Sequence, residues 1–94
     1  MKLTLTQKIS VPQDVLVQDL GGESVLLNIQ SEQYFGLDDV GTQMWQVLTE
    51  AESIQAAYDL LLAEYQVEPE QLHQDLQNLI EQLVNHGLVE VTGS

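Results

Sequence analysis

The chain has 94 residues and carries 15 Asp and Glu against two Lys and no Arg, for a formal net charge of −13. This length fits one domain, and 44% apolar residues favour a folded core over a disordered acidic tail. Two cations are too few to neutralise the phosphates of a nucleic acid or to hold the chain at an anionic membrane. The absence of cysteine excludes disulfides and metal sites built on thiolates.

No apolar run approaches the ~18 residues that a membrane-spanning helix needs, and no secretory signal begins the sequence. We therefore expect a cytoplasmic protein. The excess of carboxylates leaves two interpretations open. It is either a solubilising surface or an acidic face that steers a basic partner protein.

The N-terminal half has the composition of β-strands. Two β-rich runs, at residues 15–20 and 23–29, flank Gly21 and Gly22, and a Gly-Gly pair predicts a two-residue hairpin because primed turns need positive φ. A polar turn then leads into a short third strand at residues 33–37. These runs predict a three-stranded antiparallel meander.

After residue 37 the apolar spacing becomes helical. A first helix follows Asp38 or Asp39, either of which can accept hydrogen bonds from its first N–H groups. A second helix begins at Ser53, its expected N-cap, and runs to about Tyr65.

The third helix begins with Pro69 in its first turn and ends at Gly87, where Leu88 can fold back in a Schellman motif. Beyond it, residues 88–91 are expected as a brief extended tail. One face of this helix carries a broad apolar stripe, formed by Leu72, Leu76, Leu79, Ile80, Leu83 and Val84.

These elements predict a single domain over residues 1–94, with an ordered core at about 12–91. The fold class is α+β and winged-helix-like, with a three-stranded antiparallel β-meander followed by three α-helices. Winged helices often bind DNA, but the net charge argues against that function here.

No enzyme chemistry is indicated by the sequence. His73 and His86 lie thirteen residues apart on one helix, too far to share a metal ion, and each is interpreted as a surface or capping residue. Gly21 and Gly22 lack the context of a phosphate-binding loop. We therefore expect no catalytic residues, no metal and no cofactor.

The third strand is an edge of the predicted meander, and residues 33–37 contain neither charge nor proline to protect it from pairing. An extended peptide could add to this edge and pack against the third helix. Alternatively, Phe35 and Leu37 face the core and the chain covers its own edge. The residues alone do not decide between the two.

Several segments resemble the PqqD family. They are ESVLLN at residues 23–28, YFGLDDVGTQMW at 34–45, LLAEYQV at 61–67 and LVNHGL at 83–88, together with Asp75 before Leu76. The resemblance covers residues 12 to 91. It implies a non-catalytic recognition element in the biosynthesis of ribosomally made, post-translationally modified peptides, which binds the leader of a precursor peptide between the third strand and the third helix.

The resemblance also implies which residues bind the leader. By position they are Gln33, Tyr34, Phe35, Gly36 and Leu37 on the strand and Leu72, Asp75, Leu76, Leu79 and Leu83 on the helix. The implied partners are the precursor leader and a separate modifying enzyme, either a radical S-adenosylmethionine (SAM) enzyme or a leader peptidase. The alternative function is an acidic accessory subunit that binds a protein without binding a leader. We expect a monomer, with edge-strand pairing of two copies in a crystal as the alternative.

Overall fold

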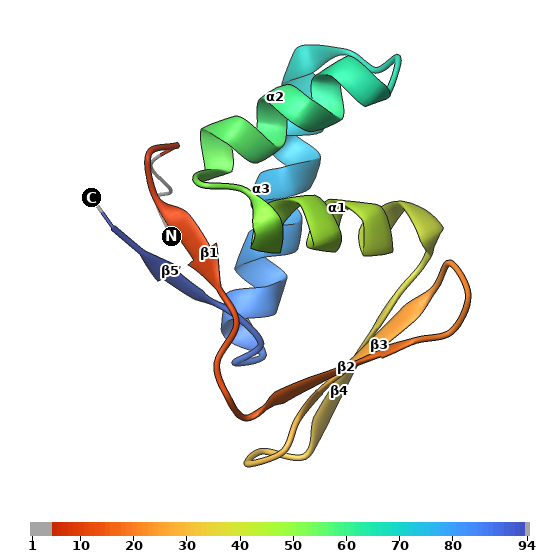
Figure 1. Ribbon diagram of the computed structural model, residues 1–94, viewed down its shortest axis with the longest axis vertical. Coiled ribbons are helices and arrows are strands. Elements are labelled where there is room, and N and C mark those ends of the chain that lie inside the picture. The colour runs from red at the N-terminus through yellow and green to blue at the C-terminus, as the bar shows by residue number, and fades with distance from the viewer. Residues whose placement is uncertain (1–4, 94) are drawn as a thin grey trace.

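The computed structural model describes residues 5–93, which form two small antiparallel sheets and three helices (Figure 1). In chain order the elements are β1 (Lys8–Ser10), β2 (Val15–Asp19), β3 (Ser24–Asn28), β4 (Gln33–Leu37), α1 (Asp39–Glu50), α2 (Ile54–Glu64), α3 (Pro69–Asn85) and β5 (Glu90–Thr92). The strand order β2-β3-β4 followed by three helices confirms the predicted fold class. None of the helices in this range is long and apolar enough to cross a membrane.

Two turns shape the three-stranded sheet. Gly21 and Gly22 have φ of +79° and +108°, and the Leu20 N–H donates to the Glu23 carbonyl at 2.8 Å, as expected for a two-residue hairpin. The second turn is organised by Asn28. Its Oδ1 accepts from the Gln30 and Ser31 N–H groups, and its Nδ2 donates to the Gly87 carbonyl at 2.7 Å. Asn28 therefore ties the β3–β4 hairpin to the end of α3.

The helix ends follow the predicted signals. Asp38 is the N-cap of α1 and accepts from the Gly41 N–H at 2.7 Å, while Ser53 caps α2. At the C-terminal end of α3, Gly87 has φ of +69°, and the Leu88 N–H donates to the Leu83 carbonyl at 2.9 Å. The Gly87 N–H donates to the Val84 carbonyl at 3.0 Å, which completes a Schellman motif.

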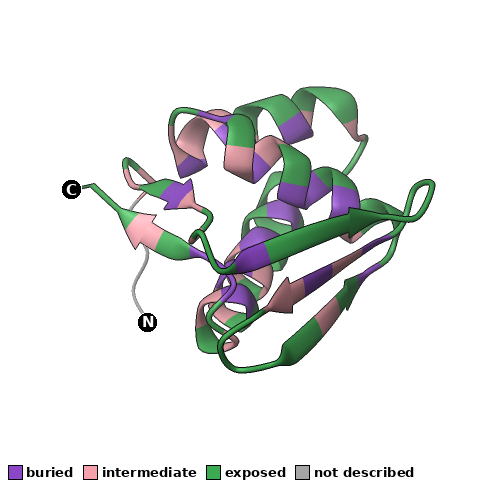
Figure 2. Cartoon of the chain, turned by 60° about the horizontal axis from the view of Figure 1, so that its bottom comes forward, coloured by how far each residue is buried: buried purple, intermediate pink, exposed green. Residues whose placement is uncertain are grey.

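The core lies where the inner face of the three-stranded sheet meets the helices (Figure 2). The sheet contributes Val15, Leu26 and Leu37, of which Leu26 is fully buried. Trp45 and Leu48 of α1 and Ile80 of α3 pack into the same cluster. By contrast, β2 and β4 are exposed along most of their length, so only part of the inner face is covered.

The second sheet was not predicted. Residues 90–92, part of which was expected only as an extended tail, pair with β1 in the antiparallel register Lys8↔Thr92, Ile9↔Val91, Ser10↔Glu90. Ile9 is 2% exposed, so β1 contributes to the core despite its short length. Figure 1 shows this ribbon at the left and the three-stranded sheet at the lower right. The C-terminal segment therefore does not cover β4.

Candidate functional site

The outer side of β4 is an open hydrogen-bonding edge. In the three-stranded sheet β4 pairs with β3 alone, and no other strand in residues 5–93 lies against it. An open edge without charge or proline is able to accept a further strand. The edge that the sequence predicted is thus present, and it is not covered by the described chain.

The register identifies the backbone groups that point outward. Leu20 and Glu23 form a hydrogen-bonded pair, and such pairs alternate with non-hydrogen-bonded pairs along an antiparallel ladder. Residues 24, 26 and 28 of β3 therefore bond to β4, through partners 37, 35 and 33. The N–H and C=O groups of Tyr34 and Gly36 point away from β3. These two residues would bond an added strand.

One side of helix α3 lies next to the β4 edge. The side chain of Phe35 lies on the inner face, in the same row as Leu26, and its ring is 5.2 Å from the ring of His86 at the end of α3. Leu79, two helical turns before His86, lies on the same side of α3 and is half-buried. An added strand would place its inward side chains against Phe35, Leu79 and His86.

The other edge of the sheet offers no such flank. Val17 of β2 shares the row of Leu26 and Phe35, yet it is 47% exposed, so no element covers the inner face there. On β2 the N–H group of Val15 points away from β3, and it already donates to the Pro12 carbonyl. A strand added to β2 would gain backbone hydrogen bonds but little packing. The β4 edge is the better candidate.

Of the ten predicted site residues, four are buried in the core and six are exposed or half-buried. Leu37, Leu72, Leu76 and Leu83 are buried in the core, at 5%, 4%, 2% and 0% exposure. Gln33, Tyr34, Gly36 and Asp75 are exposed, and Phe35 and Leu79 are half-buried. The accessible wall of α3 is therefore narrower than the leucine stripe suggested. The contacts of all ten residues with a peptide remain a prediction.

One polar residue near the site, His86, was not predicted from the sequence to belong to it. His86 was interpreted as a surface or capping residue, and it is the C-cap of α3, but it also contacts Phe35. Its Nδ1 lies 2.7 Å from the Gln82 carbonyl, and because a carbonyl oxygen can only accept, Nδ1 is the donor in this contact. The spacing of seven residues between Leu79 and His86 was the available signal.

Asp75 lies on the same flank, at a margin of the buried stripe. Its Oδ1 accepts a hydrogen bond from Gln71 Nε2 at 2.9 Å, one turn earlier. The carboxylate is exposed and keeps accepting capacity for a second donor.

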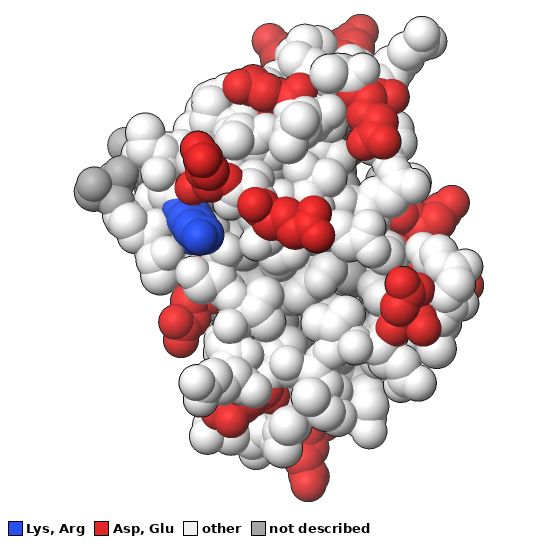
Figure 3. All heavy atoms as spheres, in the orientation of Figure 1, with Lys and Arg blue, Asp and Glu red and all other residues white. Residues whose placement is uncertain are grey.

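The surface is acidic on the face shown in Figure 3, where carboxylates are spread widely around a single basic side chain. Lys8 is the sole Lys or Arg in the described range, and it lies on β1 rather than near β4.

Burial raises the pKa of the Tyr65 hydroxyl above its ordinary value of 10.0, with smaller contributions from Glu64 and Asp39. Among the described residues, no group of three or more His, Cys, Asp and Glu could hold a metal ion.

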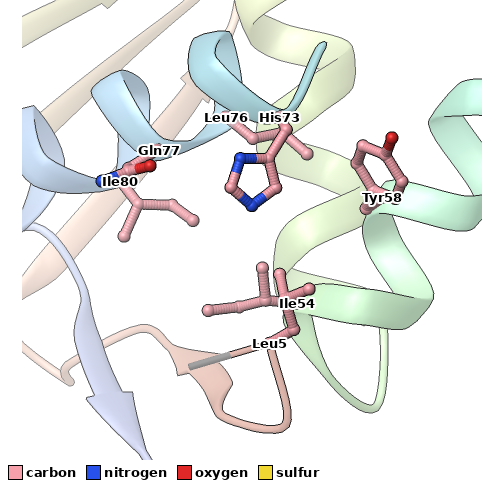
Figure 4. Close-up of a pocket in the computed structure, with 7 residues that line it drawn as sticks. All are labelled: Leu5, Ile54, Tyr58, His73, Leu76, Gln77 and Ile80. Carbon is pink, nitrogen blue, oxygen red and sulfur yellow. The ribbon is translucent and has the colours of Figure 1, made fainter. Parts of the chain in front are cut away.

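A small pocket lies on the side of α3 that faces away from Leu79 and His86 (Figure 4), between α2, α3 and the segment before β1. It is lined by Leu5, Ile54, Tyr58, His73, Leu76, Gln77 and Ile80. Among these residues, Tyr58 and His73 make an edge-to-face contact with their ring centroids 6.0 Å apart. The space of about 30 Å³ holds about one water molecule, too little for a peptide.

Comparison with known proteins adds sequence and fold relationships. A model of the family described as coenzyme PQQ synthesis protein D (PqqD) matches residues 23–89. No curated protein matches the sequence at a significant level. A solved structure, TbiB1 in complex with the TbiA(beta) leader peptide, is 32% identical, with a TM-score of 0.81 over 90% of this chain and 99% of that chain.

A further solved structure is lasso peptide synthetase B1 complexed with the leader peptide. It is 24% identical, with a TM-score of 0.78 over 88% of this chain and 98% of that chain. Identity at this level shows that the fold is shared. Both structures are nearly covered by the present chain, so the likeness extends over a whole domain.

Proposed function

This chain belongs to the PqqD family, and from that premise we propose that it is a recognition element for the leader segment of a ribosomally made precursor peptide. The observation that carries the proposal is the open edge of β4 beside the Phe35–His86 contact. The 32% identical TbiB1 structure is a complex with a leader peptide, which supports the same ligand class for this chain.

The leader would bind as a strand added to β4. Tyr34 and Gly36 offer two N–H donors and two C=O acceptors, and each hydrogen bond contributes about 0.5–1.5 kcal/mol net. Inward side chains of the leader would pack on Phe35, Leu79 and His86 and remove apolar surface from water. A disordered leader loses conformational entropy as it orders, so we expect a moderate Kd of about 0.1–10 μM.

Binding would serve a separate modifying enzyme. The chain would hold the leader and raise the effective concentration of the attached core segment near the active site of that enzyme. The enzyme would be a radical SAM enzyme or a leader peptidase, and the recognition element would take no part in the chemistry. The carboxylate-rich surface would favour a partner with a basic contact face.

A proline scan of the two sheet edges tests the proposal. Tyr34→Pro removes an N–H that points away from β3 and toward no other strand of residues 5–93. The domain should stay folded, since proline is tolerated on an edge whose N–H faces solvent. Loss of that donor and the steric block should weaken leader binding at least ~10-fold. The probes are synthetic peptides copying the N-terminal halves of short peptides encoded beside the gene, titrated by fluorescence anisotropy.

Two further variants separate the possible causes. Tyr34→Ala removes the ring and keeps the N–H, so its effect measures the side chain alone. Val17→Pro makes the same backbone change on the outward side of β2 and should leave binding unchanged. Equal loss in Val17→Pro and Tyr34→Pro would place the leader elsewhere, and no binding of any such peptide would favour the accessory-subunit alternative.

A further inference from the structure

Gly36 stands in the middle of an edge strand without an internal reason to be glycine. Its backbone does not have positive φ, unlike Gly21, Gly22, Gly87 and Gly93. A Cβ built at Gly36 would meet no atom within 4 Å. Glycine within a strand destabilises the fold relative to alanine, because it loses more backbone conformational entropy on folding. A strand glycine of this kind often marks a place where a ligand approaches closely.

The open space at Gly36 lies on the outer face of the sheet. The register aligns Gln18, Val25 and Gly36 in one row across β2, β3 and β4, and this row alternates with the buried row of Ser24 and Leu37. Val25 is half-buried in that row. Tyr34 follows on the same face, two residues along β4, with 69% of its surface exposed. The space is thus bordered by two apolar side chains.

An added strand would place one side chain directly over this space. Residues facing each other across two paired strands project from the same face of the sheet, whether the strands run parallel or antiparallel. Gly36 points its N–H and C=O outward, so in an antiparallel addition the leader residue opposite it would be held by two backbone bonds. The side chain of that residue would lie on the outer face, over the Gly36 backbone.

We propose that Gly36 is a specificity-determining residue that selects leaders with an aromatic side chain at the facing position. The inference rests on the proposed leader-binding function. A planar ring covers an unprotected glycine backbone in a sheet, and it would contact Val25 on one side and Tyr34 on the other. The recognition of the leader would then have two parts, with one set of side chains packed inward on α3 and one ring outward.

The test uses a random 12-residue displayed peptide library selected on three proteins: the native chain, Gly36→Thr and Gln18→Thr. Threonine at Gly36 has room and a higher strand propensity, so this variant should be at least as stable as the native chain in urea unfolding. Gln18→Thr is the matched control, because it lies in the same row on the other edge. Amide–amide NOEs with Gly36 identify the facing peptide residue.

The native chain and Gln18→Thr should select an aromatic residue at the facing position, and its replacement by alanine should weaken binding about tenfold. In Gly36→Thr the hydroxyl and methyl groups fill the space, so the same replacement should weaken binding less than about threefold. Peptides that contact the Tyr34 and Gly36 amides but show no aromatic preference, or the same preference in Gly36→Thr, overturn the inference and leave leader binding intact. Failure of every peptide to perturb these amides overturns both.

Discussion

Ser24 and Thr42 join the sheet to α1 through a buried polar contact. Their hydroxyl oxygens lie 2.8 Å apart, and Thr42 also donates toward the Leu37 carbonyl at 3.4 Å. The two residues are 3% and 4% exposed, in a core that is otherwise apolar over the described residues. Because β4 leads directly into α1, this contact holds the end of the candidate edge strand in place.

Replacing Thr42 with valine should lower the free energy of unfolding by about 1–3 kcal/mol, because it leaves the Ser24 hydroxyl buried without a partner. Adding Ser24→Ala removes that unpaired group. The double variant should therefore be less destabilised than the sum of the two single variants. Urea unfolding followed by circular dichroism measures all four proteins, and strict additivity would show that the two hydroxyls do not interact.

The Tyr65 hydroxyl makes the free energy of unfolding decrease at high pH. Burial raises the pKa of Tyr65 above 10.0 in the folded state, so the folded chain holds this proton more tightly than the unfolded chain. Its contribution is complete below the unfolded pKa and is lost as pH rises from 10.0 through the folded pKa. Tyr65→Phe should flatten the decline in unfolding free energy between about pH 9 and pH 11. An unchanged slope in urea unfolding across this range contradicts the assignment.

At the scale of elements, α3 has one buried stripe and two different flanks. Leu72, Leu76, Ile80 and Leu83 form the stripe and are at most 4% exposed. Leu79 and His86 border it on the side of β4, while His73 and Gln77 border it on the side of the small pocket near α2. The α3 residues that pack the core are therefore different from those that face the candidate peptide-binding edge.

This division can be measured with two leucines four residues apart. Leu83→Ala should lower the free energy of unfolding by about 2–5 kcal/mol, since it opens a cavity in the core of a small domain. Leu79→Ala should cost much less stability and should weaken leader binding about tenfold. Thermal unfolding and peptide titration of both variants decide the matter. Unaltered affinity in a folded Leu79→Ala protein would remove Leu79 from the site.

At the scale of the whole molecule, the net charge of −13 is the dominant feature. Like charges repel across a small domain, and salt screens that repulsion because the Debye length falls from about 30 Å at 0.01 M to about 10 Å at 0.1 M. The Tm should therefore rise by a few degrees over this range. A Tm that stays flat in differential scanning calorimetry would mean that the carboxylates are too dispersed to strain the fold.

The local features of this protein were readable from its sequence. The glycine pair of the first hairpin, the Ser53 cap and the Schellman motif at Gly87 each depend on a few consecutive residues. The cap of α1 was left open between Asp38 and Asp39, and the structure assigns it to Asp38. Turn and cap geometry is set by local φ/ψ preferences and short-range hydrogen bonds. The meander, the three helices and the position of the edge strand follow from these features together with the apolar periods.

The tertiary structure decided which side chains are available at that edge. Leu72, Leu76, Leu79 and Leu83 share one stripe in sequence, and only packing against α1, α2 and the sheet separates Leu79 from the other three. The contact of Phe35 with His86 and the pairing of β5 with β1 join residues that are far apart in the chain. Periodicity assigns a residue to a face of its own element, whereas burial depends on which distant element covers that face.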